Sequence, residues 1–143
     1  MYVISKLDDD NDAQAYVNIY TTTPASNTAV TTADYDQIGS TAQATAIDIT
    51  DGTTSAYNTW TLNSTGRGNI SLTSITKFGA REGHDAENIE ISPVGRTNRF
   101  IMSSADASGI TQDPKLVVEV TITSLLFLNK FTLNQAVKRA SFY

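Results

Sequence analysis

The 143-residue sequence contains no cysteine and only one histidine, His84. Without cysteine the chain has no disulfide, no thiolate metal site and no cysteine nucleophile. A single histidine excludes a metal centre built from several histidines and allows only one histidine-based catalytic group. Charged residues make up only 17% of the chain, with 15 acidic against 10 basic. The net charge of −5 argues against nucleic acid or an anionic membrane as a partner.

Long hydrophobic runs are also missing. The longest apolar cluster, residues 125–128, is far too short to cross a bilayer. Residues 1–6 do not combine a basic region with a long apolar stretch, so no secretory signal is expected there. Hydrophobic residues nevertheless make up 40% of the chain, which is enough for a core. Length and composition therefore predict one soluble domain.

Threonine is frequent and alternates with β-branched, aromatic and alanine residues in short runs, a pattern typical of half-buried strands. Such runs cover residues 15–21, 45–50, 57–63 and 115–123. In the first run Val17 and Ile19 share one face, and Tyr16, Asn18 and Tyr20 lie on the other, half-exposed face. Turn residues separate the runs, and no long amphipathic helix intervenes. Residues 1–123 are therefore predicted to form an all-β, antiparallel β-sandwich of jelly-roll type, with a meander or barrel as the alternative.

Residues 124–143 differ in character and are predicted to be a hydrophobic docking tail, either an extra strand or a short helix. Its apolar residues, proposed as a subunit interface, are Leu125, Leu126, Phe127, Leu128 and Phe131. So much apolar surface would aggregate if exposed, so it must dock on its own sandwich or on a neighbouring subunit.

Four segments of the sequence together resemble a known family. They are Thr31 to Thr41, Tyr57 to Asn63 followed by Gly66, Thr76 to Arg81 with Asp85, and Asp113 to Val118. In this order they are similar to jelly-roll β-sandwich domains of the carbohydrate-binding-module-like, disaggregatase-related (DNRLRE-type) group. The resemblance implies a non-catalytic module of phage virion and cell-surface proteins.

Domains of this group normally begin with several more strands, whereas only residues 1–12 precede the first matching strand here. The resemblance therefore predicts sheet edges without their usual partners. Such edges must be covered, either by the chain's own ends or by a strand from another subunit.

An acidic segment near the start of the chain is a candidate calcium site. Asp8, Asp10 and Asp12 are spaced at every second residue and could present three carboxylates to Ca²⁺. The segment is not an EF-hand loop, because Ala13 and Ile19 stand where that loop requires Gly and Glu. A merely solvated acidic loop is the alternative, and no other cofactor is expected.

The remaining candidate sites are His84 and two tyrosines. A catalytic triad through His84 and Asp85 would need a nucleophile elbow, and the sequence contains no G-x-S-x-G motif, so His84 is expected to be a locally hydrogen-bonded loop residue. Tyr16 and Tyr20 on one strand face could stack on a sugar ring, or else pack into the core.

These observations predict a non-catalytic structural or assembly protein. The hypothesis is a phage virion component, such as a capsid decoration, tail or fibre subunit, that associates with itself or with other virion subunits. The alternatives are a glycan-binding surface module and a small hydrolase. The expected location is the virion, or otherwise the extracellular space or a cell surface, with no nucleic acid or membrane as partner.

Overall fold

The computed structural model describes residues 1–105, 108–109 and 111–121. In this part the chain forms β1 (Val3–Leu7), β2 (Tyr16–Thr22), the 3₁₀ helix η1 (Thr32–Gln37), β3 (Ile38–Ala42), β4 (Ile47–Asp48), α1 (Ser64–Gly68), β5 (Phe78–Glu82), α2 (Gly83–Glu87) and β6 (Arg99–Met102). All strand pairs are antiparallel, and the two α-helices have five residues each. The predicted all-β class is confirmed. None of these helices is long and apolar enough to cross a membrane.

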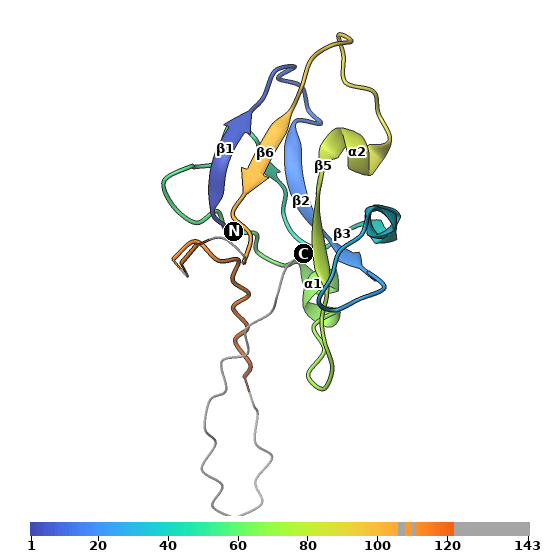
Figure 1. The fold of residues 1–143 in the computed structure, drawn as a ribbon, viewed down its shortest axis with the longest axis vertical. Coiled ribbons are helices and arrows are strands. Elements are labelled where there is room, and N and C mark those ends of the chain that lie inside the picture. Colours follow the sequence, from blue (N-terminus) through green and yellow to red (C-terminus); the bar gives the residue numbers. More distant parts are fainter. Residues whose placement is uncertain (106–107, 110, 122–143) are drawn as a thin grey trace, which may run out of the picture.

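Strand β2 is the centre of a four-stranded sheet (Figure 1). Along one edge it pairs with β5, in a register that runs from Val17 opposite Glu82 to Thr21 opposite Phe78. Its other edge is shared by β4 and β3, which pair with the beginning and the end of β2. Between these two short strands the amide of Gln43 still donates to the carbonyl oxygen of Ile19, at 2.8 Å. The chain from β3 to β4 therefore follows β2 as one interrupted strand.

Strands β1 and β6 form a separate two-stranded sheet, seen side by side in Figure 1. A hydrophobic core joins this sheet to the larger one. Its buried centre is Ala15, Val17 and Ile49, and Trp60, Ala80 and Phe100 pack against it. The rings of Trp60 and Phe100 meet edge to face at 6.0 Å, and the indole nitrogen of Trp60 donates to the carbonyl oxygen of Val17 at 2.9 Å. Because Phe100 belongs to β6, these contacts tie the two sheets together.

The prediction that β2 has one half-exposed face is wrong. Asn18 is 5% exposed and Tyr20 is 2% exposed, so the face opposite Val17 and Ile19 is buried as well. Helix α2 covers the start of this face, where Glu87 accepts a hydrogen bond from the Tyr16 hydroxyl at 2.6 Å. The alternation of polar and apolar residues does not by itself mark an exposed face, since tyrosine and asparagine have polar groups that can be satisfied inside a protein.

Several other predicted strands are shorter or absent. The run 45–50 is reduced to β4, and the run 57–63 contributes only isolated bridges, Tyr57 to Tyr2 and Leu62 to Ala44. Residues 115–121 form no strand, although this run had the clearest alternation. A strand needs a hydrogen-bonded neighbour, and none of the described residues pairs with this segment.

The jelly-roll sandwich is not confirmed, because a jelly roll has eight strands and the described residues form a four-stranded and a two-stranded sheet. Residues 122–143, with the proposed interface residues Leu125, Leu126, Phe127, Leu128 and Phe131, lie outside the described part of the chain.

Candidate functional site

The lone histidine lies at the centre of a group of acidic residues drawn from three parts of the chain. We call Asp10, Asp12, Glu82, His84 and Asn98 the His84 cluster. Asp10 and Asp12 belong to the loop between β1 and β2, Glu82 ends β5, His84 is the second residue of α2, and Asn98 directly precedes β6. The cluster therefore lies where the two sheets meet, in the upper half of the molecule in Figure 1.

Both ring nitrogens of His84 face carboxylates. Nδ1 lies 2.8 Å from Oε1 of Glu82, and Nε2 lies 3.2 Å from Oδ2 of Asp10 and 3.2 Å from Oδ2 of Asp12. The His84 side chain is 3% exposed. The short chain segment from Glu82 to His84 is fixed locally, because the Glu82 carboxylate also caps α2 by accepting the backbone N–H groups of His84 and Asp85.

Asp10 is the least satisfied member of the cluster. Its side chain is 0% exposed, and neither carboxylate oxygen has a hydrogen-bond partner among the described residues. A buried ionised carboxylate is costly unless a positive charge or hydrogen-bond donors face it. His84 lies within 3.2 Å but does not meet hydrogen-bond geometry toward Asp10.

The remaining contacts hold the loop of Asp10 in place. Oδ1 of Asn98 accepts the backbone N–H of Asp9 at 3.1 Å, and its amide nitrogen donates to Oε1 of Glu82 at 3.1 Å. Arg96 binds the other side of the loop through Asp9, at 2.9 Å. Hydrogen bonds from Arg96 and from the backbone of Thr97 lower the pKa of Asp9. Arg96 is therefore engaged by Asp9.

The pKa of His84 reflects two opposing effects. Burial lowers the pKa, but hydrogen bonds and charges from Glu82 and Asp12 outweigh burial, so that the pKa lies above the ordinary value of 6.5. The acidic neighbours of His84 thus favour its imidazolium form.

A pH dependence of stability follows from this raised pKa. Folding stabilises protonated His84, so its contribution is fully present below the unfolded-state pKa and is lost as the pH rises through the folded-state pKa. We expect the free energy of unfolding of chelator-treated protein to fall as the pH rises above 6.5. Urea unfolding at several pH values measures this, and NMR titration of the single histidine ring assigns it. A His84→Gln variant should lose this part of the pH dependence; an unchanged profile would contradict the assignment.

The structure changes the set of predicted calcium ligands. Asp10 and Asp12 come together with His84, with one potential ligand atom from each within 4.8 Å of the others. Asp8 does not join them, since its Oδ1 accepts the backbone N–H of Asn11 at 2.7 Å and shapes the turn. His84 is hydrogen-bonded locally to Glu82, as predicted, but it lies in α2 and not in a loop, and it also contacts residues more than seventy positions earlier.

The neighbouring residue Asp85 turns away from the cluster. It binds Nε of Arg81 at 2.5 Å and also accepts the Tyr35 hydroxyl. The hydrogen bond from Arg81 lowers the pKa of Asp85 in spite of partial burial. Arg81 additionally donates to the backbone of Asp85 at 2.6 Å and to Gly39 at 3.4 Å, so it fastens α2 to β3. This group is a structural brace, separate from the His84 cluster.

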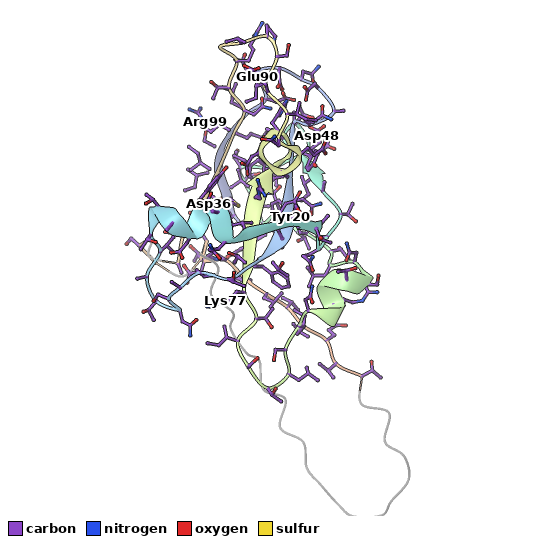
Figure 2. The ribbon with its side chains drawn as sticks, turned by 90° about the vertical axis from the view of Figure 1, so that its right-hand side faces the viewer. Tyr20, Asp36, Asp48, Lys77, Glu90 and Arg99 are labelled. Atoms are coloured by element: carbon purple, nitrogen blue, oxygen red, sulfur yellow. The ribbon has the colours of Figure 1, made fainter. Side chains whose placement is uncertain are left out.

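The two tyrosines proposed for sugar stacking do not form an exposed platform. Tyr20 is buried, and in Figure 2 it lies in the middle of the molecule, between Glu90 and Arg99 toward one end and Lys77 toward the other. Tyr16 is half-buried, and burial together with the hydrogen bond to Glu87 raises the pKa of its hydroxyl. Sugar stacking needs an open aromatic face, which Tyr20 does not provide.

A second feature is an apolar groove with a volume of about 880 Å³. Its inner wall includes Trp60, Leu62 and Phe78, which belong to the second hydrophobic cluster around Ile19 and Ala44. Residues 115–121 run along its side (orange in Figure 1). Apolar side chains of this segment are exposed: Val117 is 80%, Val118 46% and Val120 60% exposed.

Comparisons of the chain with protein-family models, with curated proteins and with solved structures found no match. The resemblance to the DNRLRE-type group therefore stays a prediction from the quoted residues.

Proposed function

We propose that the protein is a non-catalytic assembly subunit that associates with further copies of itself as a structural component of a phage virion. The observation that carries the association is the segment 115–121. It is rich in β-branched residues, borders the apolar groove and pairs with none of the described strands. A segment of this kind is suited to strand addition from another chain. The virion setting is what the sequence resemblance implies.

The segment is complementary to a second copy of itself. If two copies pair antiparallel about a twofold axis through Val117, then Lys115 of each copy lies opposite Glu119 of the other. In the same register Leu116 lies opposite Val118. Opposite charges and apolar pairs across neighbouring strands each contribute about 0.2–1 kcal/mol. This self-complementarity favours a second copy over an unrelated partner.

Pairing between copies would also provide partner strands for the sheet edges that the resemblance predicts to lack them. Each copy would gain a strand along the groove, and its exposed valines would be covered. We propose that the jelly-roll sandwich is completed in this way. The glycan-binding alternative has less support, because it depends on Tyr16 and Tyr20 as an open platform and Tyr20 is buried.

Replacing Glu119 with lysine should weaken self-association. In the proposed register the new lysine of each copy lies opposite Lys115 of the other copy. Each dimer then contains two such pairs of like charges, which repel. We expect the dimer dissociation constant to rise at least about tenfold, equivalent to about 1.4 kcal/mol. Analytical ultracentrifugation measures the change. The double variant Glu119→Lys/Lys115→Glu restores opposite charges and should recover association.

A matched pair of valine variants tests the location of the interface. Val117 and Val94 are 80% and 85% exposed, so neither substitution removes a core contact. Val117→Glu should abolish association and Val94→Glu should leave it unchanged. A wild-type protein that stays monomeric at the highest attainable concentration, or equal effects of the two variants, would refute self-association through this segment.

A further inference from the structure

We propose that Asp10, Asp12 and His84 bind a divalent first-row transition metal ion, such as Zn²⁺ or Mn²⁺, that fastens the two sheets to each other. The inference goes beyond the proposed assembly function and does not depend on it. It stands on the arrangement of the three ligand atoms, on the orientation of His84 and on the fully buried carboxylate of Asp10, which has no hydrogen-bond partner among the described residues.

The spacing of the ligand atoms fits a small ion. Nε2 of His84 lies 3.2 Å from one carboxylate oxygen of Asp10 and 3.2 Å from one of Asp12. Metal–ligand bonds of about 2.0–2.2 Å place neighbouring ligand atoms about 3.0–3.5 Å apart. One nitrogen and two carboxylate oxygens would thus occupy adjacent positions around the ion, and water can complete its coordination.

The orientation of the imidazole agrees with this role. Glu82 lies 2.8 Å from Nδ1, where it accepts the proton of that nitrogen, so that a metal ion displacing the proton of Nε2 would meet a lone pair directed toward Asp10 and Asp12. A carboxylate that binds the distal nitrogen is the usual support of a metal-bound histidine. Asn98 holds Glu82 in turn through a hydrogen bond of 3.1 Å. Glu82 and Asn98 are therefore positioning residues.

The charge balance distinguishes a metal ion from a proton. The three carboxylates of Asp10, Asp12 and Glu82 face a single imidazole. A proton on Nε2 serves the hydrogen bond to Asp12 and leaves both oxygens of Asp10 without a partner in the part of the chain that the structure describes. A divalent ion at the same place would bind Asp10, Asp12 and Nε2 of His84 at once. The imidazole nitrogen suits Zn²⁺ and the two carboxylates also suit Mn²⁺, whereas Ca²⁺ takes oxygen ligands alone.

The position of the site gives the ion a structural role. Its ligands come from the loop that follows β1 and from α2, which follows β5, so they link the small sheet to the large one. A bound ion would therefore stabilise the folded state. With free Zn²⁺ at a hundredfold excess over its dissociation constant, we expect the Tm to rise by about 5–10 °C.

Titration of chelator-treated, full-length protein with Zn²⁺ by calorimetry tests the proposal. We expect one equivalent to bind saturably and more tightly than Ca²⁺. In NMR spectra the ring signals of the single histidine should shift on Zn²⁺ addition and broaden with Mn²⁺. The absence of saturable Zn²⁺ and Mn²⁺ binding, tighter binding of Ca²⁺, or unperturbed histidine signals would each overturn the proposal.

Variants assign the ligands. Asp10→Asn keeps the shape of the side chain and should weaken Zn²⁺ binding at least about a hundredfold, and Glu82→Gln should weaken it about 10–100-fold. Asp8→Asn in the same loop is the matched control and should bind like the wild type. Equal weakening by Asp8→Asn and Asp10→Asn would contradict the assignment. If Asp10→Asn fails to fold by circular dichroism, Asp12→Asn replaces it, because its side chain is 36% exposed.

Discussion

Replacing Gly83 with alanine should destabilise the protein and disturb the His84 cluster together. A Cβ atom at this position would collide with the backbone carbonyl oxygen of Gln14 and with the ring of Tyr16. Neither neighbour can move easily, since the Gln14 oxygen belongs to the backbone and the Tyr16 ring is held against α2 by its hydrogen bond to Glu87. Overpacking of this kind costs about 1–3 kcal/mol, and a clash with backbone is expected at the upper end of that range. Urea unfolding measures the loss.

The same change should weaken Zn²⁺ binding, because moving α2 away from the β1–β2 loop separates His84 from Asp10 and Asp12. Gly68→Ala is the matched control. Gly68 also lies in a short helix, but a Cβ atom there meets nothing within 4 Å. We expect its free energy of unfolding to change by no more than about 0.5 kcal/mol. Comparable destabilisation by the two variants would show that the close packing of α2 is not the cause.

Truncating Ile49 to alanine should cause a large loss of stability without touching either candidate site. Ile49 is 0% exposed and packs with Ala15 and Val17 in the core that joins the sheets. Its backbone N–H also donates to the carbonyl oxygen of Ala15, so the backbone cannot readily collapse into the space left by the side chain. Removing a buried isoleucine side chain to alanine costs about 2–5 kcal/mol.

Ile75→Ala provides the comparison for this variant, since Ile75 is 63% exposed and the chemical change is identical. We expect a change within about 0.5 kcal/mol for the exposed site. Urea unfolding of the two variants side by side separates burial from the loss of side-chain atoms. A small effect at Ile49 would contradict the placement of the core between the sheets.

The strand-rich class and the central strand could be predicted from the sequence because they depend on neighbouring residues. The run around Val17 and Ile19 alternates over enough residues to identify β2, and the structure begins and ends this strand within one residue of the predicted bounds. For Tyr20 the sequence left two alternatives open, sugar stacking or packing into the core, and the structure shows a buried side chain. The covering of this face by α2, seen in the hydrogen bond from Tyr16 to Glu87, involves residues more than seventy positions apart and leaves no signal in the strand itself.

The segment 115–121 shows the opposite case. Its alternation of Leu116, Val118 and Val120 predicted the clearest strand, yet the described residues offer it no pairing partner. β-Propensity records how well side chains suit a pleated sheet, and it does not supply the neighbouring strand. In our proposal residues 115–121 form a strand only when they pair with a second copy of the chain.

What the sequence alone determined is the all-β class, the position of β2 and the presence of closely spaced carboxylates at Asp10 and Asp12. These features follow from local spacing and side-chain chemistry. Only the tertiary structure brought His84 to those carboxylates and excluded Asp8. The reason is physical: the contact joins residues more than seventy positions apart, and it forms because the small sheet packs on the large one. A periodic pattern within a short stretch of sequence therefore cannot predict the contact of His84 with Asp10 and Asp12.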